Sequence, residues 1–279
     1  MKFVKDTFEE YLGKKDHISA SDIKNFMTSP KKYYYEKYQK KRSEDERHFP
    51  IGSAIHEKIL EPEMFDHNFI VFPKIDKRTK DGKEQYKSFL EKAEGKTIIF
   101  QDEYDVVEKA SESARKNHTF LEMIKDGYKE VSCYTVDEKT GLKIKVRPDI
   151  LSKSKSNIID VKSCLDSSPK KFKSDVYNYG YAISAAFYLN FLEREDYIFA
   201  AIEKNQPYHL SLFVLSDDFI DYGKTQFRTG LDLIKWSYEN NYWCDHNEFE
   251  LLKECYDLGD TSNFFEERNN SNLLTIINF

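Results

Sequence analysis

The chain has 279 residues, of which 39% are hydrophobic and 15% aromatic, so it is long enough and apolar enough for a substantial packed core. Its net charge of −6 argues against nonspecific coating of nucleic acid by the whole surface. We expect a single domain over residues 1–279, made of a helical N-terminal part (1–125), a core of sheet and helix (126–240) and a C-terminal tail (241–279).

The sequence also indicates where the protein resides. Its first residues lack the apolar segment of a signal peptide, and no apolar run approaches the ~20 residues needed to span a bilayer. We therefore expect a cytoplasmic protein without a membrane partner. The cysteines lie far apart with no CxxC pair, which favours reduced thiols over a zinc site or a disulfide framework. They are Cys133, Cys164, Cys244 and Cys255.

Apolar spacing and capping signals predict mainly helices in the first part of the chain. The lysine-rich stretch 74–83 contains Gly82 and lacks an apolar pattern after Ile75, so we predict a mobile loop there. The predicted helices cover the stretch from Ser19 or Ser21 to about Pro30, then residues 33–38, 53–61, 83–93 and 102–121.

The pattern changes to strands near residue 129. Segments rich in β-branched residues flank a DEKTG turn and predict an antiparallel meander. After Trp243 the chain is polar and weakly patterned, and we expect a tail or a subunit contact. The predicted strands are 129–136, 142–150, 158–162, 197–203 and 210–215, and the predicted helices are 169–192 and 217–240. The order helix, three strands, helix, strand indicates an α/β (α+β) core of αβββαβ type behind a helical N-terminal half.

Residues 147–163, RPDILSKSKSNIIDVKS, concentrate groups that suit phosphodiester hydrolysis. Because side chains alternate along a strand, Asp160 and Lys162 share one face while Val161 points into the core. Asp149 ends the preceding strand, and a short polar connection can return it beside Asp160. We predict that Asp149, Asp160 and the Val161 carbonyl bind Mg²⁺, and that Lys162 orients the attacking water or offsets developing negative charge. An ordinary surface ion pair is the alternative for an Asp-x-Lys triplet.

The Pro-Asp followed one strand later by Asp-x-Lys resembles the PD-(D/E)XK nuclease signature, which implies a restriction-endonuclease-like core. His56 lies on a predicted helix with Ile59 and Leu60 on its side, and a histidine on an apolar face is usually a hydrogen-bonded core residue. The Gly-x-x-x-His spacing is nevertheless similar to the RecB-like branch of the superfamily, which implies that His56 is a metal ligand. Glu130 is a further candidate carboxylate near the ions, with a strand-edge charge as the alternative.

The predicted helix after the third strand carries Tyr181, Ser184, Ala185 and Tyr188 as one stripe, which could simply pack on the sheet. Its position is similar to the Gln-x-x-x-Tyr motif of RecB-like nucleases. The resemblance implies that Tyr188 takes part in catalysis and that Tyr181 and Ser184 contact DNA. Ser184 stands where the motif has Gln, and a serine is too short to make the same contacts.

Segments in matching order over nearly the whole chain resemble the exodeoxyribonuclease VIII (RecE-type) nuclease domain of phage recombination modules. They are SASDIKNFMTSPKKYYYEK, IGSAIHEKILEPEMF, DKRTKDGKEQYKSF, GLKIKVRPDIL, IIDVKS, YGYAISAAFY and LIKWSYENNYW. The resemblance implies Mg²⁺-dependent degradation of one strand of linear double-stranded DNA from 5′ to 3′, with Mn²⁺ able to substitute. The product would be a 3′ single-stranded tail for DNA recombination. A RecT-like single-strand annealing protein as partner and a homo-oligomeric ring around DNA are also implied.

Lysine and arginine are clumped although the chain is acidic overall, and each clump has a solvated helix face or loop as its alternative. Lys77, Arg78 and Lys80 are our candidates for holding DNA or its 5′ phosphate, because planar Arg can grip phosphate with two hydrogen bonds. Ser163, next to Lys162, is a further candidate DNA contact. The basic groups lie in 31–42, 74–87 and 170–173.

Two other functions are considered. An iron–sulfur nuclease of the same fold needs four clustered cysteine ligands, which the cysteine positions here do not supply. A DNA-binding or inhibitory protein that kept the scaffold and lost cleavage stays open, because Ser184 replaces the Gln of the motif. Metal-dependent release of nucleotides from linear duplex DNA separates the enzyme from the binder.

Overall fold

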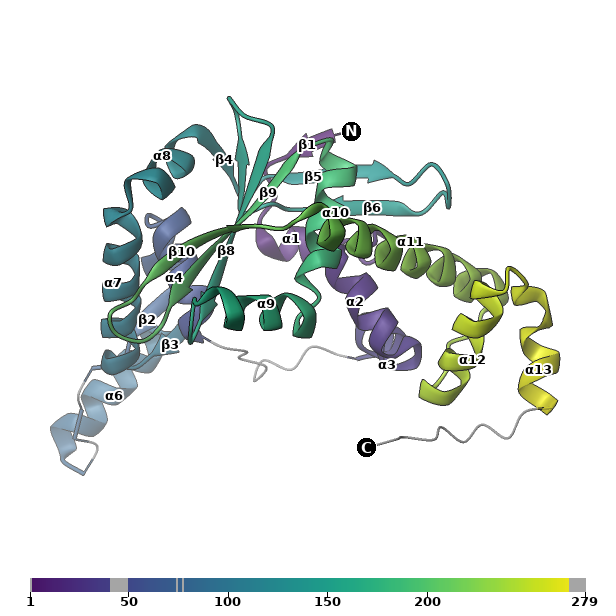
Figure 1. Ribbon diagram of the computed structural model, residues 1–279. Coiled ribbons are helices and arrows are strands. Elements are labelled where there is room, and N and C mark those ends of the chain that lie inside the picture. Colours follow the sequence, from purple (N-terminus) through teal and green to yellow (C-terminus); the bar gives the residue numbers. More distant parts are fainter. Residues whose placement is uncertain (1, 41–49, 74, 77, 271–279) are drawn as a thin grey trace.

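The computed structural model describes residues 2–40, 50–73, 75–76 and 78–270, and its centre is a mixed sheet with helices on both faces (Figure 1). The strands are β1 (Lys2–Val4), β2 (Phe69–Val71), β3 (Thr97–Ile99), β4 (Gly127–Lys129), β5 (Ser132–Val136), β6 (Lys143–Val146), β7 (Ile150–Ser152), β8 (Asn157–Cys164), β9 (Asp196–Glu203) and β10 (Leu210–Val214).

Helices occupy most of the remaining described chain. They are α1 (Phe8–Gly13), α2 (Ala20–Thr28), α3 (Pro30–Tyr34), the π-helical turn η1 (Tyr35–Gln39), α4 (Pro50–Leu60), α5 (Phe65–Asn68), α6 (Lys80–Lys92), α7 (Gln101–Lys116), α8 (His118–Asp126), α9 (Pro169–Asn178), α10 (Tyr181–Leu192), α11 (Asp217–Asn240), α12 (His246–Asp257), the 3₁₀ turn η2 (Thr261–Asn263) and α13 (Phe264–Asn270). Within the described chain, no helix is both long and apolar enough to cross a membrane.

The main sheet has five strands in the order β10-β9-β8-β7-β4. Strands β8 and β9 are parallel, whereas the other neighbours in this sheet are antiparallel. A second, antiparallel sheet contains β1-β5-β6, and β2 and β3 form a short parallel pair. The predicted meander is therefore present, but its strands are divided between two sheets.

Two predicted strands each break in the middle. The predicted strand 129–136 is β4 and β5, and 142–150 is β6 and β7. Glu130 adopts the left-handed conformation with φ 49°, which interrupts the first strand, and its amide donates to the Asp149 carbonyl at 3.1 Å. Asp149 therefore lies at the second break, just before β7, and the prediction that it ends a strand is wrong. Apolar and polar residues continue to alternate in the sequence through both breaks, so the sequence pattern did not reveal them.

Two predicted helices are each divided for local reasons, and two others match their predictions. The predicted helix 169–192 is divided into α9 and α10 at Gly180, whose φ of 61° a helix interior cannot accommodate. The predicted helix 102–121 is divided at Asn117, whose side chain accepts the Phe120 amide at 3.0 Å and starts α8. Ser19 caps α2 with a reciprocal Asp22 contact, which confirms the predicted start, and α11 matches the predicted helix 217–240.

The predicted loop 74–83 is partly helical. Thr79 accepts the Gly82 amide at 2.9 Å, so α6 begins at Lys80 rather than at residue 83. The sequence pattern missed this turn because its first residues are polar and exposed and contribute no apolar periodicity. Lys74 and Lys77 lie outside the described residues.

The C-terminal segment, which we expected to be a tail or a subunit contact, forms helices packed on the core as far as the structure describes it. Helix α12 buries Phe249 and Leu252, and Phe264 of α13 is also fully buried. The Phe249 ring meets that of Phe26 in α2 edge to face, with centroids 5.4 Å apart. Only a few apolar residues make this packing, and charged residues separate them in the sequence. The segment therefore shows only a weak apolar pattern in the sequence.

The two faces of the main sheet carry separate hydrophobic clusters. Ile158 and Phe199 belong to the cluster that includes residues of α2, α10 and α11, whereas Ile159 and Val161 belong to the cluster with residues of α4 and α7. In Figure 1 these helices stand on opposite sides of the sheet. Val161 is thus buried as predicted, and α4 is held against the face of β8 opposite to the side chains of Asp160 and Lys162.

We predict that Phe249→Ala lowers the free energy of unfolding by about 3–5 kcal/mol, because it removes a buried ring that joins α12 to α2. Urea unfolding followed by circular dichroism measures the change. Leu258→Ala is the control, since Leu258 ends the same helix but is 85% exposed. Equal stabilities of the two variants would show that the C-terminal helices do not contribute to the folded core.

Candidate active site

The break between β6 and β7 places Asp149 beside β8. Ile150 pairs with Ile159 in the antiparallel register, so Asp149 comes opposite Asp160. Asp149 Oδ2 accepts the Val161 amide at 2.7 Å. Asp149 and Asp160, predicted to lie together, are therefore adjacent.

His56 reaches this place from α4 on the other side of the sheet. A Cβ atom at Gly52 would lie 2.9 Å from Oγ of Ser163, so glycine allows the first turn of α4 to approach β8 closely. One helical turn later, His56 Nε2 lies 2.9 Å from Asp149 Oδ2 and 3.6 Å from Glu130 Oε1. The Gly-x-x-x-His spacing in the sequence thus has a geometric reason.

Glu130 is held from two directions at the other strand break. Its left-handed backbone turns the side chain toward His56, and Arg147 Nε donates to Glu130 Oε2 at 2.8 Å. The Arg147 side chain is only 9% exposed, and its Nη1 also donates to the Asp6 carbonyl at 2.9 Å and to Ser132 Oγ at 3.0 Å. Glu130 Oε1 is buried and accepts no hydrogen bond from the described residues. A buried carboxylate oxygen without a protein donor suits a cation or a water molecule as its partner.

His56, Glu130 and Asp149 can each offer one ligand atom, and these atoms lie within 4.8 Å of one another. One imidazole nitrogen and two carboxylate oxygens suit a hard or borderline divalent ion such as Mg²⁺ or Mn²⁺. The residues therefore fit a metal centre. Asp160 is adjacent to this group, but its Oδ2 lies 2.5 Å from Lys162 Nζ instead, in an ion pair that lacks good hydrogen-bond geometry.

The charged groups of this cluster strongly shift one another's pKa values. Burial acts to lower the pKa of His56, but the carboxylates of Asp149 and Glu130 outweigh it and raise the pKa to about 9. Burial acts to raise the pKa of Asp149, but His56, Lys162 and the Val161 amide lower it to about 2. At neutral pH the metal-free site thus contains an imidazolium paired with an Asp149 carboxylate.

The pKa values of Glu130 and Asp160 are raised, whereas that of Asp149 is lowered. Burial, reinforced by the negative charge of Asp149, raises the pKa of Glu130 to about 7 and that of Asp160 to about 6. Burial alone would lower the pKa of Lys162, but Asp160 and Asp149 outweigh it and raise that pKa above its ordinary value. A bound cation would relieve the repulsion among these carboxylates.

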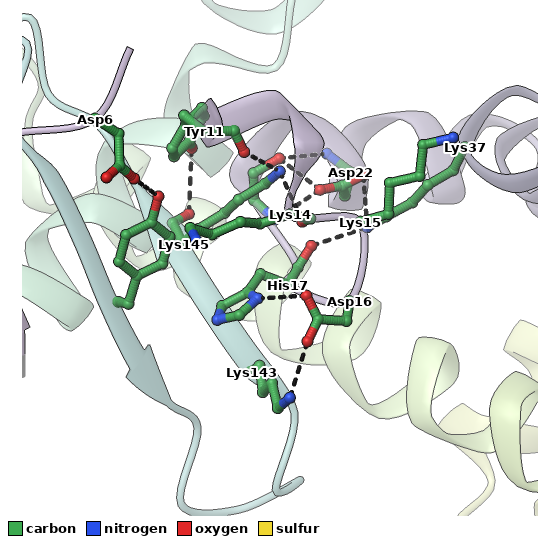
Figure 2. A network of polar contacts seen from close by, with 12 residues as sticks. Asp6, Tyr11, Lys14, Lys15, Asp16, His17, Asp22, Lys37, Lys143 and Lys145 are labelled. Atoms are coloured by element: carbon green, nitrogen blue, oxygen red, sulfur yellow. Dashed lines mark hydrogen bonds and ion pairs between the residues drawn. The ribbon is translucent and has the colours of Figure 1, made fainter. Parts of the chain in front are cut away.

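A cleft of about 2070 Å³ opens from this cluster. Residues from the N-terminal segment 5–15, from α2 and from α4 line it together with Lys162. Figure 2 shows how the N-terminal segment is fastened: Lys145 Nζ donates to the Tyr11 carbonyl at 2.9 Å and to the Lys14 carbonyl at 3.0 Å. Burial lowers the pKa of Lys145 to about 8. One wall of the cleft is thus built from a segment that the sequence did not single out.

The residues of the predicted stripe on α10 make different contacts. Lys162 Nζ lies 5.3 Å from the Tyr181 ring centroid, and Tyr181 lines the cleft. Tyr188 OH donates to the Arg147 carbonyl at 3.2 Å and accepts the Arg147 amide at 3.3 Å. Ser184 is half-buried and, within the described chain, does not belong to the cleft lining. Ser163 lines the cleft beside Lys162.

The candidate phosphate-binding loop lies apart from the cleft. Arg78 is 90% exposed and donates to both Asp76 carboxylate oxygens, at 2.9 and 3.1 Å. Lys80 is exposed at the start of α6. Neither residue lines the cleft in the described structure, and Lys77 falls outside the described residues.

Arg147 is the functional residue that sequence reasoning missed. In the sequence Arg147 is only the residue before Pro-Asp, and nothing in that motif indicates a contact with Glu130, 17 residues earlier. Its buried guanidinium links the Glu130 carboxylate to the N-terminal wall of the cleft at Asp6.

The sheet order, the paired acidic residues and the Asp-x-Lys on β8 define a member of the PD-(D/E)XK nuclease superfamily, as predicted. Residues 19–254 match the family described as a PDDEXK-like domain of unknown function (DUF3799), and the chain belongs to this family. The search of curated proteins found no match.

Solved structures with similar folds include a candidate exonuclease from Eubacterium rectale. It has a TM-score of 0.52 and 14% identity, over 83% of this chain and 86% of that one, and it shows the shared fold. A phage-related exonuclease from Haemophilus somnus 129PT has a TM-score of 0.35 and 12% identity, over 70% of this chain and 97% of that one. An alkaline exonuclease from Laribacter hongkongensis has a TM-score of 0.28 and 14% identity, over 58% and 87%. The last two TM-scores are too low to support an inference.

We predict that the metal-free protein loses stability as pH rises from about 6.5 to 9, relative to a His56→Gln variant. The pKa of His56 is raised from 6.5 to about 9 on folding, so the folded state binds the proton more tightly and its contribution disappears over this range. Urea unfolding of both proteins in EDTA at several pH values measures the difference. Parallel pH profiles would contradict the imidazolium–carboxylate pair.

Proposed function

We propose that the protein is a divalent-metal-dependent exodeoxyribonuclease that degrades one strand of linear double-stranded DNA from 5′ to 3′ and leaves a 3′ single-stranded tail. The observation that supports this most directly is the convergence of His56, Glu130 and Asp149, from α4 and two strand breaks, around a buried carboxylate oxygen without a donor. Asp160 and Lys162 complete the proposed site, and Lys162 lines the cleft.

The proposed ligands of Mg²⁺, with Mn²⁺ able to substitute, are His56, Glu130 and Asp149, joined by Asp160 and the Val161 carbonyl. When bound, the ion would polarise the scissile phosphate and lower the pKa of a coordinated water. To bind it, His56 gives up the proton it shares with Asp149, and the carboxylates of Glu130 and Asp160 ionise.

Lys162 is the proposed catalytic cation. Its pKa is raised by Asp160 and Asp149 against the effect of burial, so it carries a full positive charge at neutral pH. The ammonium can orient the attacking water or offset the negative charge that develops on the phosphoryl oxygens. Tyr188 also lines the cleft, and in its proposed catalytic role its hydroxyl fixes the Arg147 backbone while the Arg147 guanidinium holds Glu130.

Several finer elements of the proposal derive from the sequence resemblance to the exodeoxyribonuclease VIII nuclease domain. These are the polarity, the 3′ tail, the RecT-like annealing partner, the ring and the role of Arg78 and Lys80 in holding a 5′ phosphate. The name of the Eubacterium rectale neighbour, a candidate exonuclease, agrees with the reaction class. Ser163 and Tyr181, which line the cleft with Lys162, are proposed DNA contacts, and the resemblance adds Ser184, which lies outside the cleft lining.

We predict that wild-type protein releases nucleotides from linear duplex DNA in Mg²⁺ or Mn²⁺, and that Asp149→Asn and Lys162→Ala each lower the rate by about 10²–10⁴-fold. Acid-soluble release from uniformly labelled DNA measures the rate. Lys125→Ala is the control, because Lys125 is 62% exposed on α8 and pairs only with Glu122 among the described residues. Binding of DNA without release by wild type would instead favour the alternative of a DNA-binding protein that has lost cleavage.

We also predict that a label on the 5′ end of one strand is lost before a label on its 3′ end. A blunt linear duplex carrying either label, sampled over time on a denaturing gel, distinguishes the two directions. A closed circular duplex is the control and stays intact, since an exonuclease requires an end. Earlier loss of the 3′ label would contradict the proposed polarity while leaving the metal-dependent reaction in place.

A further inference from the structure

Two tyrosine rings lead away from the proposed catalytic lysine. Lys162 Nζ lies 5.3 Å from the centroid of the Tyr181 ring, and the Tyr181 and Tyr179 rings are 5.6 Å apart with an interplanar angle of 32°. Tyr181 lines the cleft and is half-buried, whereas Tyr179 is 59% exposed. The path therefore runs from the bottom of the cleft to solvent.

The backbone that carries these rings is anchored although the outer ring is exposed. The Tyr179 amide donates to the Asp175 carbonyl at 2.9 Å, and its carbonyl accepts Lys24 Nζ at 3.4 Å. Gly180, with φ 61°, makes the turn from α9 to α10, and a Cβ there would lie 2.8 Å from Cδ of Lys24. A fixed backbone under an exposed aromatic ring means that little conformational entropy is lost when a planar partner stacks on it.

The charges around the rings suit a polyanion. Lys24 and Lys162 lie on this side of the site, and the Lys24 pKa is lowered to about 8 by burial and then by Lys162. Asp175 pairs with Lys171 and Lys162 pairs with Asp160. Lys24 instead contacts the Tyr179 carbonyl and pairs with no carboxylate among the described residues, so Lys24 supplies the uncompensated positive charge here. Phosphate groups that follow the two lysines would place their bases over the tyrosine rings.

Another exposed tyrosine nearby does not share this geometry. Tyr177 is 57% exposed on α9, but its ring packs against Phe219 with centroids 5.1 Å apart and against Tyr222 at 6.2 Å. Asp217, Asp218 and Asp221 belong to the same end of α11, which disfavours DNA there. Around the junction of α9 and α10, Tyr179 and Tyr181 are therefore better placed for a nucleobase than Tyr177.

We propose that Tyr179, backed by Tyr181, stacks on an unpaired base of the strand whose phosphate lies at Lys162. Bases inside a duplex are already stacked on both faces, so Tyr179 selects a nucleotide that has left the duplex, as at a frayed end. This inference rests on the proposed nuclease function and names how that function recognises its substrate. Tyr179 is a substrate-binding residue and takes no part in holding the metal.

The first test is binding of a fluorescein-labelled duplex with four unpaired nucleotides at one end, measured by anisotropy in Ca²⁺, with DNA integrity checked on a gel. Tyr179→Ala should weaken binding by about 5–150-fold, whereas Tyr179→Phe should bind like wild type because the ring is kept. Tyr128→Ala is the matched control, since Tyr128 is 56% exposed on the far edge strand β4. Mn²⁺ affinity, measured by calorimetry, should be equal in all four proteins.

The second test removes the base rather than the tyrosine. Duplexes with an abasic site at each of the four unpaired positions in turn are bound to wild type and to Tyr179→Ala. At one position the abasic DNA should bind wild type as weakly as intact DNA binds the variant, with no further loss when both changes are combined. Additive losses at all four positions, or equal affinities of wild type and Tyr179→Ala, would overturn the stacking role.

The outcomes separate the two proposals. A wild-type protein that cleaves linear DNA but is insensitive to Tyr179→Ala would refute the stacking surface alone. A wild-type protein that neither binds nor cleaves DNA would refute the nuclease function, and the stacking surface with it.

Discussion

Negative charge concentrated at the junction of two sheets is the constraint on which the rest of the site depends. Asp149, Glu130 and Asp160 are buried or half-buried within a few ångströms of one another, and such carboxylates repel unless cations lie between them. His56, Arg147 and Lys162 supply positive charge from three directions. The repulsion among these carboxylates therefore favours the binding of a cation.

Both strand breaks lie at this acidic cluster, one at Glu130 and the other at Asp149. Glu130 adopts a left-handed conformation, which is uncommon outside glycine, and Asp149 accepts the Glu130 amide at its carbonyl and the Val161 amide at its side chain. Strained backbone at functional sites persists only when the surroundings determine it strongly. Here the surroundings are the ladder of β7 with β8 on one side and the buried Arg147 on the other. The break turns two ordinary strands into a corner at which side chains from both sheets converge.

The N-terminal segment joins the cleft to the charged cluster. Arg147 contacts Glu130 with one nitrogen and the Asp6 carbonyl with another, so the wall of the cleft and a proposed metal ligand share one side chain. Lys145, two residues earlier on β6, holds the Tyr11 and Lys14 carbonyls. Lys145 on β6 and Arg147, just after the end of β6, thus fasten the same segment at two points. Displacement of this segment would be transmitted to Glu130 without passing through the hydrophobic core.

Local sequence determined much of the architecture. The period of the apolar residues was sufficient for α11 and for the β9–β10 pair, and the Ser19 and Asp22 capping pattern located the start of α2. Alternation along β8 was sufficient to place Asp160 and Lys162 on one face with Val161 buried behind them. The helix that carries His56 was also predicted, and it is present as α4. These features depend on residues near one another in the chain, so short patterns contain the relevant information.

Tertiary structure decided the remainder. The strand breaks at Glu130 and Asp149, the folded C-terminal helices and the Arg147–Glu130 contact arise from partners distant in sequence, and alternation or polarity alone does not reveal them. The sequence predicted Asp149 beside Asp160, with His56 and Glu130 as further candidate ligands. The distances that group His56 and Asp149 with Glu130 required three elements to meet at one corner. The sequence gives the chemical type of each side chain. Which charged side chains lie next to one another depends on how the helices and sheets pack.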